Sequence, residues 1–157
     1  MKSKDHAAVW VPPPLLFVGP LVAAAALDSL VPRPISAGGG LAVTVGGLAI
    51  VAASVALGLS SVASFQRMKT TILPAGRPTT SIVDRGAYAF TRNPMYLAMA
   101  LAYLGLMAVL NTLWALGFFP VVVAVVDRFV IRREERYLVE KFGETYVSYC
   151  SRVRRWM

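Results

Sequence analysis

Cysteine, histidine and charged side chains are scarce in this chain of 157 residues, which contains one cysteine, one histidine and 15% charged residues. A single cysteine excludes an intramolecular disulfide, and a single histidine near the N-terminus excludes a Cys/His metal cluster and a Ser-His-Asp or Cys-His nucleophilic site. Soluble domains normally contain about 25% charged residues. Because hydrophobic residues make up 57% of the sequence, a domain of this length has no interior large enough to bury them. We therefore expect a lipid bilayer to surround much of the chain.

Two uncharged stretches in the first half predict transmembrane helices. Residues 41–65 are 25 residues without a charged side chain, which is enough to cross about 30 Å of hydrocarbon at about 1.5 Å per residue. Residues 9–30 are the second candidate, in which Pro12–Pro14 suit the entrance of a helix and Pro20 predicts a kink. The alternative for this segment is a cleaved signal peptide, because it follows two lysines and ends in alanines. The three prolines argue against that alternative.

A third uncharged stretch, residues 95–126, is too long for one transmembrane helix and short for two with a turn. Its polar break is Asn111-Thr112, so it predicts a tight helical hairpin with arms at 94–110 and 113–131. The chain is thus predicted to be one all-α, multi-pass membrane domain over residues 1–157. In this prediction four transmembrane helices are joined by a loop at 66–93 and followed by an amphipathic helical tail at 132–157.

The positive charges follow the predicted topology. Of sixteen lysines and arginines, fifteen lie before the first helix, in the 66–93 loop or from Arg128 onward. Four spans place these three segments on one side, so the positive-inside rule puts both termini and the loop in the cytoplasm. The net charge of +8 is then mainly a consequence of topology, with contact to lipid headgroups as the alternative, and it does not indicate nucleic-acid binding.

The end of the loop carries a local signal for a helix start. Asn93 before Pro94 is a good N-cap followed by proline at the first helical position. The free N–H groups there, with Arg92 beside them, also make a possible anion site at the membrane surface. The alternative for Arg92 is an interfacial cation that extends from the membrane into water.

The tail combines adjacent carboxylates with an aromatic stripe. Glu134 and Glu135 lie among arginines, which is typical of a charge-balanced helix face, and their directions differ by roughly 100° on a helix. A hydrophobic stripe follows at Leu138, Phe142, Tyr146 and Tyr149, and Gly143 predicts a break into two short helices. This stripe either lies on the membrane or folds back against the 66–93 loop.

Together, the two segments resemble a known enzyme family. The first supplies Gly86-x-Tyr88 and Arg92-Asn93-Pro94-x-Tyr96; the second supplies Glu134-Glu135-x-x-Leu138 and Phe142-Gly143-x-x-Tyr146-x-x-Tyr149 before a basic end that includes Arg155. In this order around a helical hairpin, they resemble the isoprenylcysteine carboxyl methyltransferase family, which also takes in bacterial relatives and the phospholipid N-methyltransferases. The resemblance covers residues 65–157. The chain departs from the family pattern at Asn93, where many members have histidine, and at Ala98, where glycine is common.

The resemblance implies a membrane-embedded enzyme of the bacterial plasma membrane that transfers a methyl group from S-adenosylmethionine to a lipophilic acceptor, either isoprenylcysteine-carboxylate-like or a lipid. It implies no metal, catalytic roles for Arg92 and Glu135, and a cofactor site formed by Tyr88, Arg92, Asn93, Tyr96, Glu134, Glu135, Tyr146 and Tyr149. Two alternatives remain open on the same scaffold. One is a non-catalytic membrane accessory protein, and the other is a membrane enzyme similar to the sterol reductases.

Overall fold

The computed structural model describes residues 12–38, 40–67 and 81–157, and all the regular elements in these ranges are helices. In chain order they are α1 (Pro13–Leu30), α2 (Leu41–Arg67), a 3₁₀ turn η1 (Gly86–Ala89), α3 (Pro94–Val109), α4 (Trp114–Val125), a π-helical segment η2 (Val126–Ile131), α5 (Arg132–Phe142) and α6 (Glu144–Arg152). The prediction of an all-α fold is therefore confirmed for the described part of the chain.

The apolar helices begin and end close to the predicted residues. Helix α1 begins at Pro13, as the proline-rich entrance predicts, and continues through Pro20; residues 9–11 of the predicted helix lie outside the described residues. Helix α2 begins at the predicted Leu41 and extends two residues beyond the predicted end, to Arg67. Helix α3 begins at Pro94, directly after the predicted N-cap.

The predicted fourth helix, residues 113–131, corresponds to α4 followed by η2, which ends at Ile131. Helices α4 and α5 are joined through η2 into one helix of 29 residues, Trp114–Phe142, so the apolar span continues into the charged tail without a turn. The π-helical segment carries Asp127 and Arg128, and the apolar part of the helix ends with it at Ile131. Because the helix is continuous, the first turns of the tail extend in the same direction as the apolar helix.

Three helices in the described residues are long and apolar enough to cross a membrane, namely α1, α2 and Trp114–Phe142. Helix α3 is apolar but has only 16 residues. The described residues therefore contain three or four helices that could span a bilayer. The fourth crossing remains a prediction, because about 20 apolar residues are the usual length of a membrane span.

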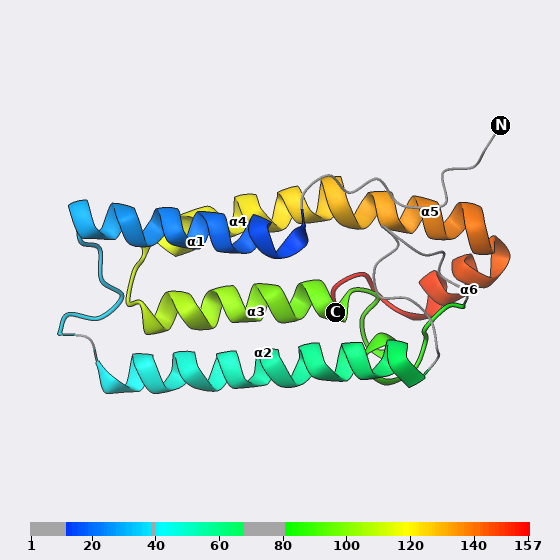
Figure 1. The fold of residues 1–157 in the computed structure, drawn as a ribbon, viewed down its shortest axis with the longest axis horizontal. Helices are drawn as coiled ribbons and strands as arrows, with labels where there is room; N and C mark the ends of the chain where they lie inside the picture. Colours follow the sequence, from blue (N-terminus) through cyan, green and yellow to red (C-terminus); the bar gives the residue numbers. More distant parts are fainter. Residues whose placement is uncertain (1–11, 39, 68–80) are drawn as a thin grey trace.

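The helices form an elongated bundle in which α2 lies along α3 and α1 lies along α4 (Figure 1). Glycines permit the close approach of α2 and α3. A Cβ atom added at Gly47 would lie 2.7 Å from the carbonyl oxygen of Gly105, and one added at Gly105 would lie 2.8 Å from the carbonyl oxygen of Gly47. The two backbones touch at this crossing, as is common where membrane helices pack through small residues.

One end of the bundle is closed by two turns that hydrogen-bond to each other. Asn111 lies in the turn between α3 and α4, and its backbone adopts a left-handed conformation with φ of 52°. Its side chain accepts a hydrogen bond from the backbone N–H of Ser36 and donates one to the Ser36 carbonyl, both at 3.0 Å. Nearby, the Thr112 hydroxyl donates to the Asp28 carboxylate at 2.9 Å. The predicted hairpin at Asn111-Thr112 is confirmed.

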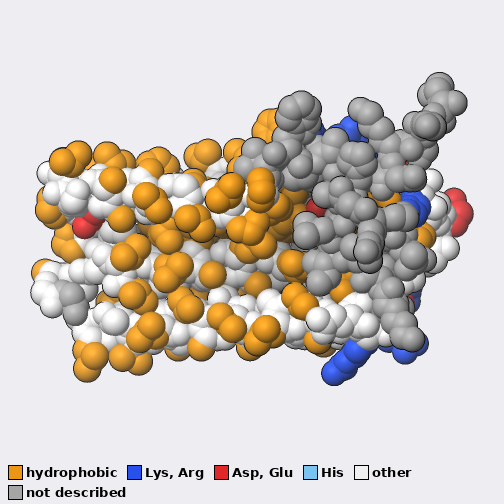
Figure 2. All heavy atoms as spheres, in the orientation of Figure 1, with side chains coloured by type: hydrophobic (Ala, Val, Ile, Leu, Met, Phe, Trp, Pro, Cys, Tyr) orange, Lys and Arg blue, Asp and Glu red, His pale blue; other side chains and the backbone are white. Residues whose placement is uncertain are grey.

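The outer surface of the bundle is strongly apolar. Hydrophobic side chains cover the length of the helices, whereas lysines and arginines gather at the end where α5 and α6 lie (Figure 2). The exposed hydrophobic side chains include Val22, Leu48, Leu59 and Val121, with more than half of the surface of each accessible. An exposed apolar surface of this extent matches a lipid environment better than water. The charged end contains the residues of both sequence motifs.

Candidate active site

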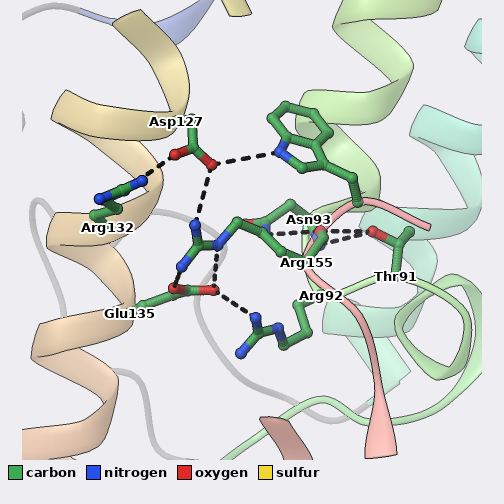
Figure 3. Close-up of polar contacts among 8 residues, drawn as sticks. Thr91, Arg92, Asn93, Asp127, Arg132, Glu135 and Arg155 are labelled. Carbon is green, nitrogen blue, oxygen red and sulfur yellow. Dashed lines mark hydrogen bonds and ion pairs between the residues drawn. The ribbon is translucent and has the colours of Figure 1, made fainter. Parts of the chain in front are cut away.

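The C-terminal residues connect the two sequence motifs. After α6 the chain returns to the start of α3, where the backbone N–H of Arg92 donates to the carbonyl of Arg154 at 2.9 Å. The carbonyl of Arg155 accepts two further hydrogen bonds, from the Thr91 hydroxyl and from the Asn93 side-chain amide, both at 3.0 Å (Figure 3). These bonds attach the last residues of the chain to the segment that leads into α3.

The side chain of Asn93 therefore has a different role from the predicted one. The residue does stand at the N-cap position of α3, and its backbone carbonyl accepts a hydrogen bond from Leu97 at 3.0 Å. Its side chain makes no capping hydrogen bond, because the amide is turned toward the carbonyl of Arg155. Proline at the next position lacks an N–H, so the helix start needs less capping.

Glu135 lies between two arginines from distant parts of the chain. Its Oε1 is 3.3 Å from a terminal nitrogen of Arg92, and Arg155 donates to both of its carboxylate oxygens, at 3.2 and 2.5 Å (Figure 3). The side chains of Arg92 and Glu135 are each only 14% exposed. Fork-shaped, partly buried arginine–carboxylate contacts of this kind hold both groups in a defined orientation. The cluster thus joins the loop, α5 and the C-terminus.

Asp127 extends this cluster toward the end of the apolar helix. It accepts hydrogen bonds from Arg132 at 3.0 Å, from Arg155 at 3.3 Å and from the indole of Trp156 at 3.4 Å. From the sequence, Asp127 was predicted only to lie in the fourth helix, at 113–131, and Arg155 only to belong to the basic end of the family motif. Asp127 directly follows the uncharged stretch 95–126, and this position was the available signal, because a carboxylate at the end of such a stretch needs a partner.

Glu134 faces a different partner from its neighbour. Its Oε1 accepts a hydrogen bond from the Tyr96 hydroxyl at 2.8 Å, so the two glutamates point to different groups, as their helix positions predict. Glu134 lies beyond the apolar part of its helix, which ends at Ile131. Burial, opposed by the Tyr96 hydrogen bond and assisted by the Glu135 charge, raises the pKa of Glu134 to about 7. This carboxyl can therefore change charge near neutral pH.

The aromatic stripe of the tail folds back against the loop. Tyr146, Tyr149 and Val153 form a buried cluster with Ile82 of the loop packed against it. The Tyr149 hydroxyl donates to the carbonyl of Tyr88 at 2.7 Å. Burial raises the pKa of both tail tyrosines well above the usual range, so they remain neutral hydrogen-bonding groups. Of the two possibilities left open by the sequence, the structure has the tail packed on the loop.

The break between the two tail helices is confirmed at Gly143. Helix α5 ends at Phe142 and α6 begins at Glu144, with Gly143 between them at φ of 54°. Glycine adopts this left-handed conformation without the steric cost that a side chain imposes. The turn directs α6 back toward the start of α3, which is how Tyr146 and Tyr149 reach the cluster.

One polar atom in this region has no partner among the described residues. The Nε of Arg92 is buried and makes no hydrogen bond there, although a terminal nitrogen of the same guanidinium pairs with Glu135. An unsatisfied buried donor is costly, and such atoms commonly mark places where a ligand or water completes the site. The structure therefore brings all eight predicted site residues to one end of the bundle, where the Nε of Arg92 has no hydrogen-bond partner in the described part of the chain.

Comparisons with known proteins give a family. The sequence model of a family described as phospholipid methyltransferase matches residues 42–145. A cobalt-zinc-cadmium resistance protein, CzcN, from Cupriavidus metallidurans is 30% identical over 92 residues, which are 59% of this chain and 42% of that protein. The alignment thus spans less than half of the length of that relative. An uncharacterized protein from Haemophilus influenzae is 42% identical over 62 residues, covering 35% of this chain and 98% of that protein. No solved structure matches the chain.

Proposed function

The chain belongs to the phospholipid methyltransferase family, and we propose that it transfers a methyl group from S-adenosylmethionine to a lipophilic acceptor at the membrane surface. The observation that carries this proposal is the joining of the two motifs into one charged cluster, in which Arg92 retains a buried N–H without a described partner. The acceptor is proposed to be an isoprenylcysteine-like carboxylate or a lipid.

The residues present suit the groups of this cofactor. S-adenosylmethionine carries a carboxylate, an ammonium, ribose hydroxyls and a sulfonium cation. The free Nε–H of Arg92 is a donor for a carboxylate, and Glu134 and Glu135 are acceptors for an ammonium or for hydroxyls. Tyr88, Tyr96, Tyr146 and Tyr149 supply buried aromatic rings next to these charges, and Asn93 fixes the backbone that carries Arg92.

The chemistry needs positioning more than it needs a reactive side chain. When bound, S-adenosylmethionine supplies an activated methyl group for in-line displacement, a reaction that requires neither a covalent nucleophile nor a metal. Arg92 is held by Glu135 and by the backbone bond to Arg154, so its direction is fixed before any ligand arrives. The packed tyrosines of the tail keep water away from this region, which strengthens the charge contacts inside it.

The proposal is tested by calorimetric titration of S-adenosylmethionine into the purified full-length protein in detergent. We expect binding to the unaltered protein and a loss of about tenfold or more in affinity for Glu135→Gln, which corresponds to about 1.4 kcal/mol. Glu144→Gln is the matched control, because Glu144 is an exposed glutamate at the start of α6. Thermal unfolding of each variant confirms that the fold is intact.

Failure of the unaltered protein to bind S-adenosylmethionine would contradict the proposal and favour a non-catalytic accessory protein. Binding of a nicotinamide dinucleotide instead would favour the reductase alternative. If binding is observed, incubation with a radiolabelled methyl donor and fractionated membrane lipids identifies the acceptor class. Transfer of label neither to a lipid fraction nor to an added prenylated cysteine would contradict the lipophilic-acceptor part of the proposal.

A further inference from the structure

An open groove of about 610 Å³ lies along α5 and adjoins the cluster that carries the proposed function. Four arginines, two glutamates and one valine line it: Arg128, Arg132, Arg136, Arg155, Glu135, Glu140 and Val139. The groove is therefore cationic. The contacts of the proposed methyl-transfer site leave two of these arginines unexplained.

The arginines of the groove differ in how their charge is balanced. Arg132 pairs with Asp127, and Arg155 pairs with both Asp127 and Glu135. Within residues 12–38, 40–67 and 81–157, no carboxylate lies within ion-pair distance of Arg128 or Arg136. The Nε of Arg136 donates to the carbonyl of Arg132 at 3.3 Å, so the hydrogen bond of this group is made within its own helix and supplies no counter-charge. Two positive charges in the groove thus lack a counter-charge from the described chain.

The spacing of these charges makes an external anion favourable. Arg128, Arg132 and Arg136 follow one another at intervals of four residues, which places them along one side of the continuous helix. Arg132, in the middle of this row, is already balanced by Asp127, whereas Arg128 and Arg136 at its ends have no carboxylate partner among the described residues. A phosphate beside either of these two arginines supplies the missing negative charge, and the planar guanidinium matches its oxygens in pairs.

The position of the groove points to a lipid as the source of the phosphate. Arg128 lies in the π-helical segment at the end of the apolar part of the helix, and Phe129 and Val121 of the same helix are 54% and 62% exposed. An anion at Arg128 thus lies just beyond an exposed apolar surface. A phospholipid at a bilayer interface has the same arrangement, with acyl chains followed by a phosphate. Basic residues near the membrane surface attract anionic lipids.

We infer that the groove lined by Arg128, Arg132 and Arg136 binds the phosphate of an anionic membrane phospholipid. The groove adjoins the proposed cofactor contacts, since Glu135 belongs to both, but lipid binding at Arg128 and Arg136 does not depend on methyl transfer. Glu135 and Arg155 line the groove and also belong to the charged cluster, so a bound lipid touches the outer side of that cluster. The ligand is held as a structural lipid.

Delipidated full-length protein in a neutral detergent provides the test. Mixed micelles containing phosphatidylglycerol or phosphatidylcholine are added, and bound lipid is measured by native mass spectrometry alongside the thermal unfolding midpoint. We expect phosphatidylglycerol to remain bound and to raise the midpoint, because a ligand that binds only the folded state stabilises it. We expect Arg128→Gln/Arg136→Gln to weaken this binding by about tenfold or more, as loss of charge-assisted hydrogen bonds predicts.

The matched control is Arg67→Gln/Arg152→Gln, which removes the same charge from two exposed arginines outside the groove. It should retain phosphatidylglycerol. If the first double variant does not fold, Arg136→Gln alone serves, since its exposed side chain supports no described tertiary contact beyond α5. Equal lipid binding by groove and control variants, or equal retention of phosphatidylcholine, would overturn the inference.

Inorganic phosphate distinguishes a lipid from a soluble source. Inorganic phosphate competes for the same guanidinium groups but lacks the acyl chains that lie against the apolar helix, so we expect phosphate alone to raise the unfolding midpoint much less than phosphatidylglycerol does. An equal or larger rise with inorganic phosphate alone would show that the groove prefers a free phosphate, and the lipid assignment would then be wrong.

Discussion

Arg92 connects the loop to the tail, and its local surroundings distinguish two roles. The sequence allowed an interfacial cation with its charge in water, but the side chain is only 14% exposed and pairs with Glu135. A charge held in this way depends on the shape of the guanidinium as well as on its sign. Lysine keeps the charge and loses the planar set of donors.

We predict that Arg92→Lys reduces S-adenosylmethionine affinity by about tenfold or more, because a single ammonium replaces a fork of N–H donors. The same calorimetric titration measures this loss. Arg85→Lys, an exposed arginine of the same loop, is the control and should bind as the unaltered protein does. Full binding and turnover by Arg92→Lys would return Arg92 to the role of an interfacial cation.

Glu134 is the residue whose charge depends most directly on pH. Its pKa is raised to about 7 in the folded protein from an ordinary value of 4.5. Between these values the folded state holds a proton that the unfolded state has lost. The stability contribution of this group is therefore present at low pH and is lost as pH rises through about 7.

Glu134→Gln should isolate this effect, since glutamine is neutral at every pH and can still accept the Tyr96 hydrogen bond. The measured quantity is the unfolding midpoint of Glu134→Gln minus that of the unaltered protein. We predict that this difference is larger at pH 8.5 than at pH 6 by a few degrees, which is about the shift that 1 kcal/mol produces in a chain of this size. Thermal scans of both proteins at the two pH values give the difference, in which the other titrating groups cancel. A difference that is constant or falls with pH would contradict the raised pKa.

At the scale of elements, the contact between α2 and α3 depends on two glycines. A Cβ atom at Gly47 would come within 2.7 Å of a backbone oxygen, which a side-chain rotation cannot relieve. The adjacent Gly46 faces open space, since a Cβ atom added there would meet nothing within 4 Å. The two neighbours on one helix therefore form a matched pair for substitution.

We predict that Gly47→Ala lowers stability by about 1–3 kcal/mol, the usual cost of overpacking. Gly46→Ala should be neutral or stabilising by up to about 1 kcal/mol, because alanine is the better helix former. Thermal or denaturant unfolding in the same detergent measures both. Equal behaviour of the two variants would mean that α2 and α3 do not meet at Gly47.

The whole molecule is divided into an apolar bundle and one charged end (Figures 1 and 2). The end of α2, the start of α3 and the C-terminus share the charged end, whereas the turns near Ser36 and Asn111 form the opposite one. This arrangement agrees with the distribution of basic residues from which a cytoplasmic charged end was predicted.

We predict that the charged end faces the cytoplasm. In a chain with Cys150→Ser, a cysteine at the exposed Ser148 should resist a membrane-impermeant thiol reagent added to intact cells, and one at the exposed Ala37 should react. Permeabilised cells provide the control, in which both positions react. Labelling of Ser148→Cys from outside intact cells would reverse the orientation.

The sequence by itself determined the helical class, the starts of α2 and α3, the hairpin at Asn111-Thr112 and the break at Gly143. These features depend on local chemistry: uninterrupted apolar length, a proline without an N–H, and a glycine that accepts a positive φ. The two motifs could also be recognised, because residue types at fixed spacing are visible in one dimension.

Only the tertiary structure decided which partners these residues meet. Glu135 contacts arginines 43 residues before it and 20 residues after it. The side-chain amide of Asn93 donates to the carbonyl of Arg155 instead of capping α3. Tyr149 packs on the loop rather than on the membrane. Helix periodicity gives the direction of a side chain from its own helix, but not the segment that packs there. That choice is made when distant segments bury their charges and aromatic rings against one another.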